Sequence, residues 1–201
     1  MLSVYALKPG FQNLLRPLVS RLAAAKVTPN QVTVAAALSS LLVGLDLAFG
    51  TQTWILLPLW LPMRMALNAI DGMLARGYGL STQLGAVLNE TLDILSDIAL
   101  TLPFATVASI NSTFVLLATL AAVLVEIAGF IRPGPRRYEG PFGKSDRAVA
   151  LGVAGAWLGL HLPLSQTVVT AVCWIWILLC GMTMINRLRP IASSPMRGSL
   201  G

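Results

Sequence analysis

Six apolar runs recur along this chain of 201 residues, and each is long enough to cross a lipid bilayer as a helix. A transmembrane helix needs about 20 predominantly apolar residues. The runs cover residues 32–49, 54–74, 84–107, 114–131, 148–164 and 168–185. Only 11% of the residues are charged, whereas a soluble domain carries about 25%. The sequence therefore predicts an all-α integral membrane protein with six transmembrane helices.

The segment before the first run has the spacing of an amphipathic helix. Its apolar side chains form one stripe, made of Phe11, Leu14, Leu15, Leu18, Val19 and Leu22. Arg16 and Arg21 fall largely off that stripe, so we expect a helix lying in the membrane interface. A plain soluble arm is the alternative. The expected organisation is a juxtamembrane segment (1–27), a six-helix membrane domain (28–189) and a disordered tail (190–201).

The net charge of +6 is distributed unevenly. Lys and Arg gather before the first run, between the second and third, between the fourth and fifth, and after the sixth. The opposite loops, at residues 50–53, 108–113 and 161–166, contain neither. The positive-inside rule then puts both termini on the cytoplasmic side of a membrane that we expect to be a prokaryotic cytoplasmic membrane. This alternation favours membrane lipid, and not nucleic acid, as the partner of the basic residues.

The stretch from Asn68 to Asp97 holds four of the eight acidic residues, which are Asp71, Glu90, Asp93 and Asp97. Asn68 and Asp71 are three apart, while Asn89, Asp93 and Asp97 step by four, so each set lies along one face of a helix. A glycine-rich turn joins the two helices. Carboxylate and amide oxygens should therefore point at each other and form a pocket for a hard cation.

Burying this acidic set in a membrane is costly. A carboxylate at mid-bilayer costs roughly 2.5–3.5 kcal/mol, and four of them on the order of 10–14 kcal/mol. Arg64 and Arg76 are the basic residues of these two spans, so we expect internal ion pairing not to neutralise the set. Bound Mg²⁺ or Mn²⁺ would do so. A polar helix contact, a water-filled cavity and a proton or ion pathway remain alternatives.

Two other segments offer polar groups to a ligand. Thr28 is expected to cap the first span with Pro29 at its first position, and Asn30 and Thr33 are then placed to face a headgroup. The loop at 132–147 carries five basic residues against two acidic ones. These basic residues either set the membrane orientation of the chain or form an anion site for a substrate phosphate. We assign the anion site to Lys144 and Arg147, with Arg137.

The acidic stretch resembles the signature of the CDP-alcohol phosphatidyltransferases, D-x-x-D-G-x-x-A-R-x8-G-x-x-x-D-x-x-x-D. The matching residues are Asp71, Gly72, Ala75, Arg76, Gly85 and Asp93, each at the required spacing. Asn68 and Asn89 fill the first and third acidic positions. The six-span layout and the Thr28-Pro29-Asn30-x-x-Thr33 opening also resemble that family.

The resemblance implies an enzyme of phospholipid synthesis, which transfers the phosphatidyl group of a CDP-diacylglycerol-type donor to a small alcohol and releases CMP. It further implies a homodimer. Asp93 would be the general base. The CDP pocket would comprise Asn30, Thr33, Asp71, Gly72, Ala75, Arg76 and Gly85, and the metal ligands would be Asn68, Asp71, Asn89, Asp93 and Asp97. The basic loop favours a phosphorylated acceptor.

The two asparagines leave the metal count open at one or two ions. Three arrangements would account for the two missing negative charges. The site could bind a single metal, Glu90 or Asp97 could supply charge, or the acceptor could bring its own phosphate. Asp97 is favoured over Glu90 because it continues the face of Asn89 and Asp93. Two other functions remain open. One is a catalytically impaired member of the same fold that binds a CDP-lipid or nucleotide, and the other is an ion or proton transporter.

Overall fold

The computed structural model describes residues 8–50, 53–131 and 140–189, and these residues form helices and no strands. The helices are α1 (Lys8–Ala24), α2 (Pro29–Phe49), α3 (Leu56–Gly77), α4 (Gln83–Thr101), the 3-10 helix η2 (Leu102–Thr106), α5 (Ser112–Phe130), α6 (Lys144–Gly159) and α7 (Gln166–Leu188). The all-α prediction is confirmed for the described residues. The tail predicted at 190–201 lies outside them.

The six expected spans fall on α2 to α7. Three of these helices, α2, α5 and α7, are long and apolar enough on their own to cross a membrane. The helices α3 and α4 carry the ionisable residues of the predicted site, and α6 has 16 residues, about 24 Å at 1.5 Å per residue. The count of six membrane crossings therefore stays a prediction, as does the interfacial position of α1.

Several helix boundaries differ by a few residues from the expected spans, and two of these differences have a clear physical cause. The third span continues past Thr101 only as the 3-10 helix η2, because Pro103 lacks the N–H that an α-helix needs. The helix of the fifth expected span, α6, begins at Lys144, four residues before the expected start at 148. The backbone N–H of Gly143 donates to Asp146 Oδ2 at 2.9 Å and so satisfies one free donor at the start of the helix. Lys144 and Arg147 therefore lie in the first helical turn instead of the loop.

The start of α2 is fixed by its sequence. The Gln31 N–H donates to Thr28 Oγ1 at 3.3 Å, and the Thr28 N–H donates to Gln31 Oε1 at 2.9 Å. This reciprocal pair, with Pro29 at the first helical position, confirms the predicted cap. It sets Asn30 and Thr33 at the end of α2 that is nearest the α3–α4 turn.

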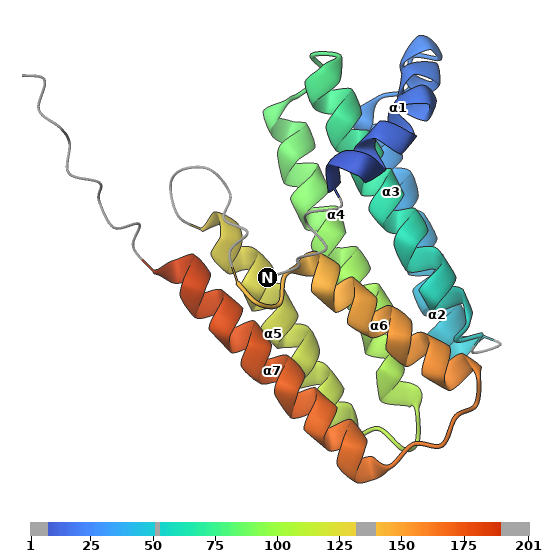
Figure 1. Ribbon diagram of the computed structural model, residues 1–201, viewed down its shortest axis with the longest axis vertical. Helices are drawn as coiled ribbons and strands as arrows, with labels where there is room; N and C mark the ends of the chain where they lie inside the picture. Colours follow the sequence, from blue (N-terminus) through green and yellow to red (C-terminus); the bar gives the residue numbers. More distant parts are fainter. Residues whose placement is uncertain (1–7, 51–52, 132–139, 190–201) are drawn as a thin grey trace, which may run out of the picture.

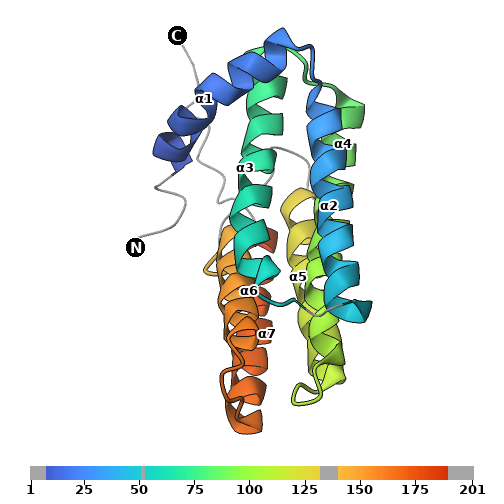
Figure 2. The same cartoon turned by 90° about the vertical axis from the view of Figure 1, so that its right-hand side faces the viewer.

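The helices form two packed groups. In one, α2 packs against both α3 and α4, and α1 crosses the end of α3 (Figure 2). In the other, α5 and α7 lie side by side (Figure 1). The helix α6 packs along α3, and η2 contacts both α2 and α5. The first turn of α6 is thereby brought towards the middle of the bundle.

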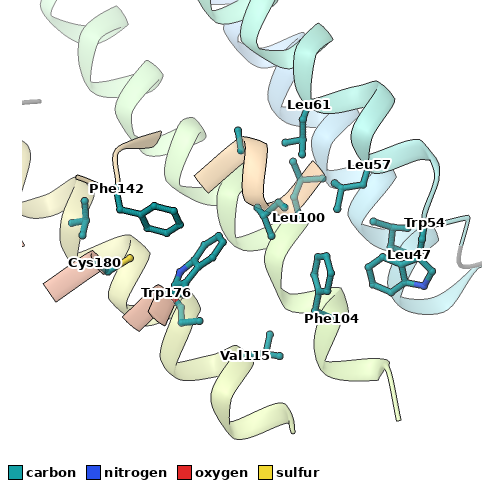
Figure 3. Packing of buried hydrophobic residues seen from close by; sticks show 14 residues of the cluster. Leu47, Trp54, Leu57, Leu61, Leu100, Phe104, Val115, Phe142, Trp176 and Cys180 are labelled. Carbon is teal, nitrogen blue, oxygen red and sulfur yellow. The ribbon is translucent and has the colours of Figure 1, made fainter. Parts of the chain in front are cut away.

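Two apolar clusters stabilise this arrangement. The larger one includes Leu57, Leu61, Leu100, Phe104 and Trp176 (Figure 3). The smaller one joins α1 to the other end of α3 and contains Val19, Val32, Ile70 and Leu74. Along α3, Arg64 and Asn68 lie between the residues of the two clusters.

The apolar stripe of α1 divides into two rows. Leu15, Val19 and Leu22 pack against α2 and α3 in the smaller cluster. Leu14 and Leu18 are 76% and 46% exposed and point away from it. The outward row gives α1 a free apolar face of the kind that interfacial helices bury in the headgroup region.

Gly44 lets α2 and α4 approach closely, because an added Cβ would overlap the backbone carbonyl of Ala99. We expect Gly44→Ala to lower the melting temperature, since overpacking costs about 1–3 kcal/mol and exceeds the gain in helix propensity of about 1 kcal/mol. Gly181→Ala in α7 is the control, because a Cβ there meets nothing within 4 Å. Thermal unfolding in detergent micelles measures both. Equal melting temperatures for the two variants would contradict the close approach.

Candidate metal and phosphate site

The facing sides of α3 and α4 bring together four of the predicted ligands. Asn68 and Asp71 come from α3, and Asn89 and Asp93 from α4. The Asn68 Nδ2 donates to Asp93 Oδ1 at 2.9 Å, and the Asn89 Nδ2 donates to Asp71 Oδ2 at 2.8 Å. The three- and four-residue spacings of the sequence thus place these side chains on facing sides, as expected. Each amide is bound to a carboxylate of the opposite helix.

Asp71 is held by a third helix as well. The Thr33 hydroxyl of α2 donates to Asp71 Oδ2 at 2.9 Å, and both residues are buried. Thr33 therefore orients Asp71 from the side of α2. Its assignment to the CDP pocket stays a prediction.

Asp93 faces two cations. The Lys144 Nζ lies 2.5 Å from Asp93 Oδ2, and the Arg64 Nη2 lies 3.4 Å from Asp93 Oδ1 and 3.0 Å from its carbonyl oxygen. The expectation that ion pairing would not neutralise the acidic set is therefore wrong for Asp93 and Asp97. Residues 144–147 were expected in a loop, but they form the first turn of α6, which brings Lys144 against α4.

Asp97 is bound by two guanidinium groups. Its Oδ1 lies 2.6 Å from Arg64 Nη1, and its Oδ2 lies 3.5 Å from Arg147 Nη2. Arg64, which needs a partner within an apolar span, finds it in Asp97 and Asp93. Asp97 lies one helical turn beyond the four facing positions, and the structure shows it in ion pairs with Arg64 and Arg147. Its assignment as a metal ligand stays a prediction.

The ion pairs continue into α5 and α7. The Arg147 Nη2 lies 2.5 Å from Glu126 Oε1, and the Arg187 Nη1 lies 3.7 Å from the same oxygen. Arg187 also donates to the Val125 carbonyl at 2.7 Å. We call Arg64, Asp97, Arg147, Glu126 and Arg187 the buried ion network. Glu126 and Arg187 were not among the predicted site residues, although an ionisable residue at an apolar span signals a buried partner.

The residues assigned to the CDP pocket surround two glycines. An added Cβ at Gly72 would lie 2.9 Å from Arg76 Nη2, so the Arg76 guanidinium lies over Gly72. An added Cβ at Gly85 would lie 2.8 Å from Asn30 Oδ1. With glycine at both positions, these polar side chains lie close against the backbone. The structure therefore brings Gly72 together with Arg76, and Gly85 with Asn30, near the α3–α4 turn.

A cavity of about 620 Å³ opens between α1 and the end of α3. It is lined by Gln12, Arg16, Pro17, Val19, Ser20, Met73, Arg76, Gly77 and Tyr78. Two guanidinium groups and no carboxylate among these residues suit an anionic ligand. Arg76 belongs both to this cavity and to the predicted CDP pocket. Arg16 was predicted only as part of a membrane-surface helix, because residue spacing within α1 does not reveal which helix α1 crosses.

The donor chemistry of the four facing residues fits one hard cation. Carboxylate and amide oxygens are ligands that Mg²⁺ accepts. Within the described residues, no group of three or more His, Cys, Asp or Glu side chains is arranged to hold a metal, since two of the four positions are asparagine. Of the predicted phosphate-binding residues, Lys144 contacts Asp93 and Arg147 is buried in the ion network. Arg137 lies outside the described residues.

Comparison with known proteins gives a family match and several relatives. The family model for CDP-alcohol phosphatidyltransferase matches residues 26–181. The inner membrane protein YnbA of Escherichia coli is 46% identical over 165 residues, which is 80% of this chain and 82% of YnbA. The archaetidylinositol phosphate synthase of Pyrococcus horikoshii is 35% identical over 91 residues, 45% of this chain and 47% of that enzyme. YnbA and the apolar helices support an integral membrane protein.

Two solved structures share the fold. Phosphatidylinositol phosphate synthase (PgsA1) of Mycobacterium tuberculosis with CDP-DAG bound superposes with a TM-score of 0.70 at 21% identity, covering 90% of this chain and 94% of that one. The same enzyme in complex with manganese and citrate gives 0.68 at 20% identity, covering 86% of each chain. At these identities the likeness shows the fold.

The buried ion network predicts a strong effect of removing one charge. We expect Glu126→Gln to lower the free energy of unfolding by about 3–5 kcal/mol, because buried Arg187 would lose its ion pair with Glu126 and buried Arg147 would keep only its pair with Asp97. Asp146→Asn is the matched control, since an amide oxygen still accepts the Gly143 N–H, and its cost should stay near 1 kcal/mol. Thermal unfolding in micelles compares them. Similar losses in both variants would show that the network adds little stability.

Proposed function

Because the chain belongs to the CDP-alcohol phosphatidyltransferase family, we propose that it transfers the phosphatidyl group of a CDP-diacylglycerol-type lipid to an alcohol acceptor and releases CMP. The sequence resemblance to this family of phospholipid-synthesis transferases is confirmed. The observation that carries the proposal is the convergence of Asn68, Asp71, Asn89 and Asp93 between α3 and α4. These residues occupy the four acidic positions of the family signature.

The donor would bind at the end of the bundle where α1 crosses α3. Gly72, Ala75 and Gly85 are small there, and Arg76, whose guanidinium lies over Gly72, offers charged hydrogen-bond donors to a phosphate. The cavity beside Arg76 adds Arg16, so that its two cations match a negatively charged nucleotide. PgsA1, which shares the fold, has been solved with CDP-DAG bound. The CDP-DAG bound to PgsA1 supports a CDP-lipid as the donor for this chain.

The reaction would be a single displacement at phosphorus. The acceptor hydroxyl oxygen forms a bond to the phosphorus that carries diacylglycerol, the bond from that phosphorus to the bridging oxygen breaks, and CMP leaves with that oxygen. Asp93 takes the proton of the hydroxyl. A bound Mg²⁺ or Mn²⁺ would neutralise charge on the diphosphate. Asn68, Asp71, Asn89 and Asp93 would hold it.

Lys144 is the best-placed contact for a phosphate on the acceptor. Its side chain is 28% exposed and lies against Asp93, where the acceptor hydroxyl must approach. Arg147 is 3% exposed and bound to Glu126, so it would hold α6 in place and contact the phosphate less directly. This arrangement favours a phosphorylated alcohol as acceptor.

The membrane setting completes the proposal. The distribution of Lys and Arg supports a site and both termini on the cytoplasmic side of a prokaryotic cytoplasmic membrane. A homodimer, and the division into segments 1–27, 28–189 and 190–201, are parts of the same proposal.

A second candidate function is binding of a CDP-lipid or nucleotide without turnover. It is favoured by the two asparagines and by the Lys144 contact to Asp93, which together reduce the free negative charge of the site. A cation pathway is less well supported, because Arg64, Lys144 and Arg147 lie against its acidic residues. Proton or cation flux into liposomes that depends on Asp93 and Asp97, and is indifferent to CDP-lipid, would favour a transporter.

The deciding experiment is mass spectrometry of lipid products. Purified protein is incubated with CDP-diacylglycerol, Mg²⁺ or Mn²⁺, and a mixture of neutral and phosphorylated alcohols. We expect a new phospholipid and an equal amount of CMP. Donor binding without CMP release from folded protein would select the binding function.

Replacing the proposed base gives a direct prediction. Asp93→Asn should lower CMP release by about 10²- to 10⁴-fold, because the amide cannot accept the hydroxyl proton, while donor binding is retained. Asp46→Asn, near the far end of α2, is the control for an acid-to-amide change and should leave CMP release unchanged. Full activity of the Asp93 variant would remove Asp93 from the mechanism.

The cavity beside α1 gives a second prediction. Arg16→Gln should raise the KM for the CDP-lipid about tenfold with little change in kcat, since one charge-assisted hydrogen bond to the donor is lost. Arg21→Gln is the control, because Arg21 is exposed on the same helix and does not line the cavity. Steady-state kinetics in mixed micelles measure both. Equal effects of the two substitutions would indicate attraction of α1 to the membrane surface and not a donor contact.

A further inference from the structure

The four facing positions of α3 and α4 carry two negative charges. Asn68 and Asn89 are neutral, and each donates a hydrogen bond to a carboxylate of the opposite helix. Asn68 Nδ2 lies 2.9 Å from Asp93 Oδ1, and Asn89 Nδ2 lies 2.8 Å from Asp71 Oδ2. The Oδ1 of each asparagine is thus left as a neutral oxygen ligand. Four carboxylates at these positions would match two divalent cations. Two carboxylates match one.

The two carboxylates have different surroundings. Asp71 Oδ2 accepts hydrogen bonds from Thr33 and Asn89, which are both neutral. Asp93 has the Lys144 ammonium 2.5 Å from Oδ2 and the Arg64 guanidinium 3.4 Å from Oδ1. The charge of Asp93 is therefore balanced by protein groups, whereas the donors to Asp71 Oδ2 carry no charge.

We propose that each chain binds one divalent cation, on the side of Asp71, and that the Lys144 ammonium takes the place of a second cation beside Asp93. This inference rests on the proposed function, because it concerns the same site. A second divalent ion at Asp93 would lie against the Lys144 ammonium, and like charges at such distances repel strongly in an apolar bundle. Asp71 with the Oδ1 atoms of Asn68 and Asn89 supplies the oxygen ligands for the single ion, so the four ligands of the proposed function are narrowed to three, with Asp93 paired to Lys144.

The fold holds Lys144 where this role requires it. Lys144 is the first residue of α6, and the start of that helix is fixed by the Gly143 N–H bond to Asp146. One turn later, Arg147 is bound to Glu126 and lies against Asp97. The backbone that carries the ammonium is therefore held by the Gly143–Asp146 hydrogen bond before it and by the Arg147 ion pairs after it. The ammonium would supply positive charge to the diphosphate beside Asp93.

The test is the number of Mn²⁺ ions bound per chain. The full chain, in nanodiscs that contain CDP-diacylglycerol, is titrated with Mn²⁺, and free Mn²⁺ is measured by electron paramagnetic resonance. We expect one ion per wild-type chain and two per chain in the triple variant Asn68→Asp, Asn89→Asp, Lys144→Gln. Asn111→Asp, at the start of α5, adds a carboxylate far from the site and should still bind one ion.

Two Mn²⁺ ions per wild-type chain, or no saturable binding, would overturn the inference. If the triple variant does not fold, the double variant Asn89→Asp with Lys144→Gln is titrated instead, and a stoichiometry that stays at one would count against the role of Lys144. CMP release is measured separately on the same samples. One bound ion without CMP release contradicts the proposed function alone, whereas CMP release with two bound ions contradicts the single-ion site alone.

Discussion

Pairing of buried charges is the constraint on which this bundle depends. Arg64, Arg147 and Arg187 are each at most 4% exposed, and each lies against a carboxylate from another helix. Lipid tails are as apolar as leucine, so apolar side chains alone give little preference for one helix arrangement over another. A buried charge does give such a preference, because leaving it without a partner is strongly destabilising. The buried ion network therefore fixes how α3 to α7 lie relative to one another.

Close helix contacts make these ion pairs possible. Gly44 lets α2 approach α4 at Ala99, and an added Cβ at Gly155 of α6 would lie 2.8 Å from Leu57 Cβ of α3. The second contact sets α6 close to α3, and its first turn then reaches Asp93 and Asp97. Small residues on one face of a helix thus control charge contacts more than one turn away. Packing and electrostatics are parts of the same arrangement here.

What the sequence could predict was local. The helices, the cap at Thr28 and the facing set on α3 and α4 follow from spacings of three to eight residues, which helix geometry converts directly into faces. The contact of Lys144 with Asp93 could not be predicted, because it depends on how α6, which packs along α3, is placed relative to α4. The same holds for Arg16 beside Arg76 and for Glu126 between two arginines. Hydropathy also placed the start of α6 too late, because its first turn carries charged residues and the apolar run begins only after them.

The balance of charge explains why two asparagines are tolerated at the ligand positions. The site and the buried ion network together hold four carboxylates, Asp71, Asp93, Asp97 and Glu126, and four cationic side chains, Arg64, Lys144, Arg147 and Arg187. Two further carboxylates would each add roughly 2.5–3.5 kcal/mol to the cost of placing the chain in the bilayer. With the protein groups already balanced, an incoming divalent ion adds two positive charges. An anionic diphosphate is the ligand that such an excess of positive charge would attract.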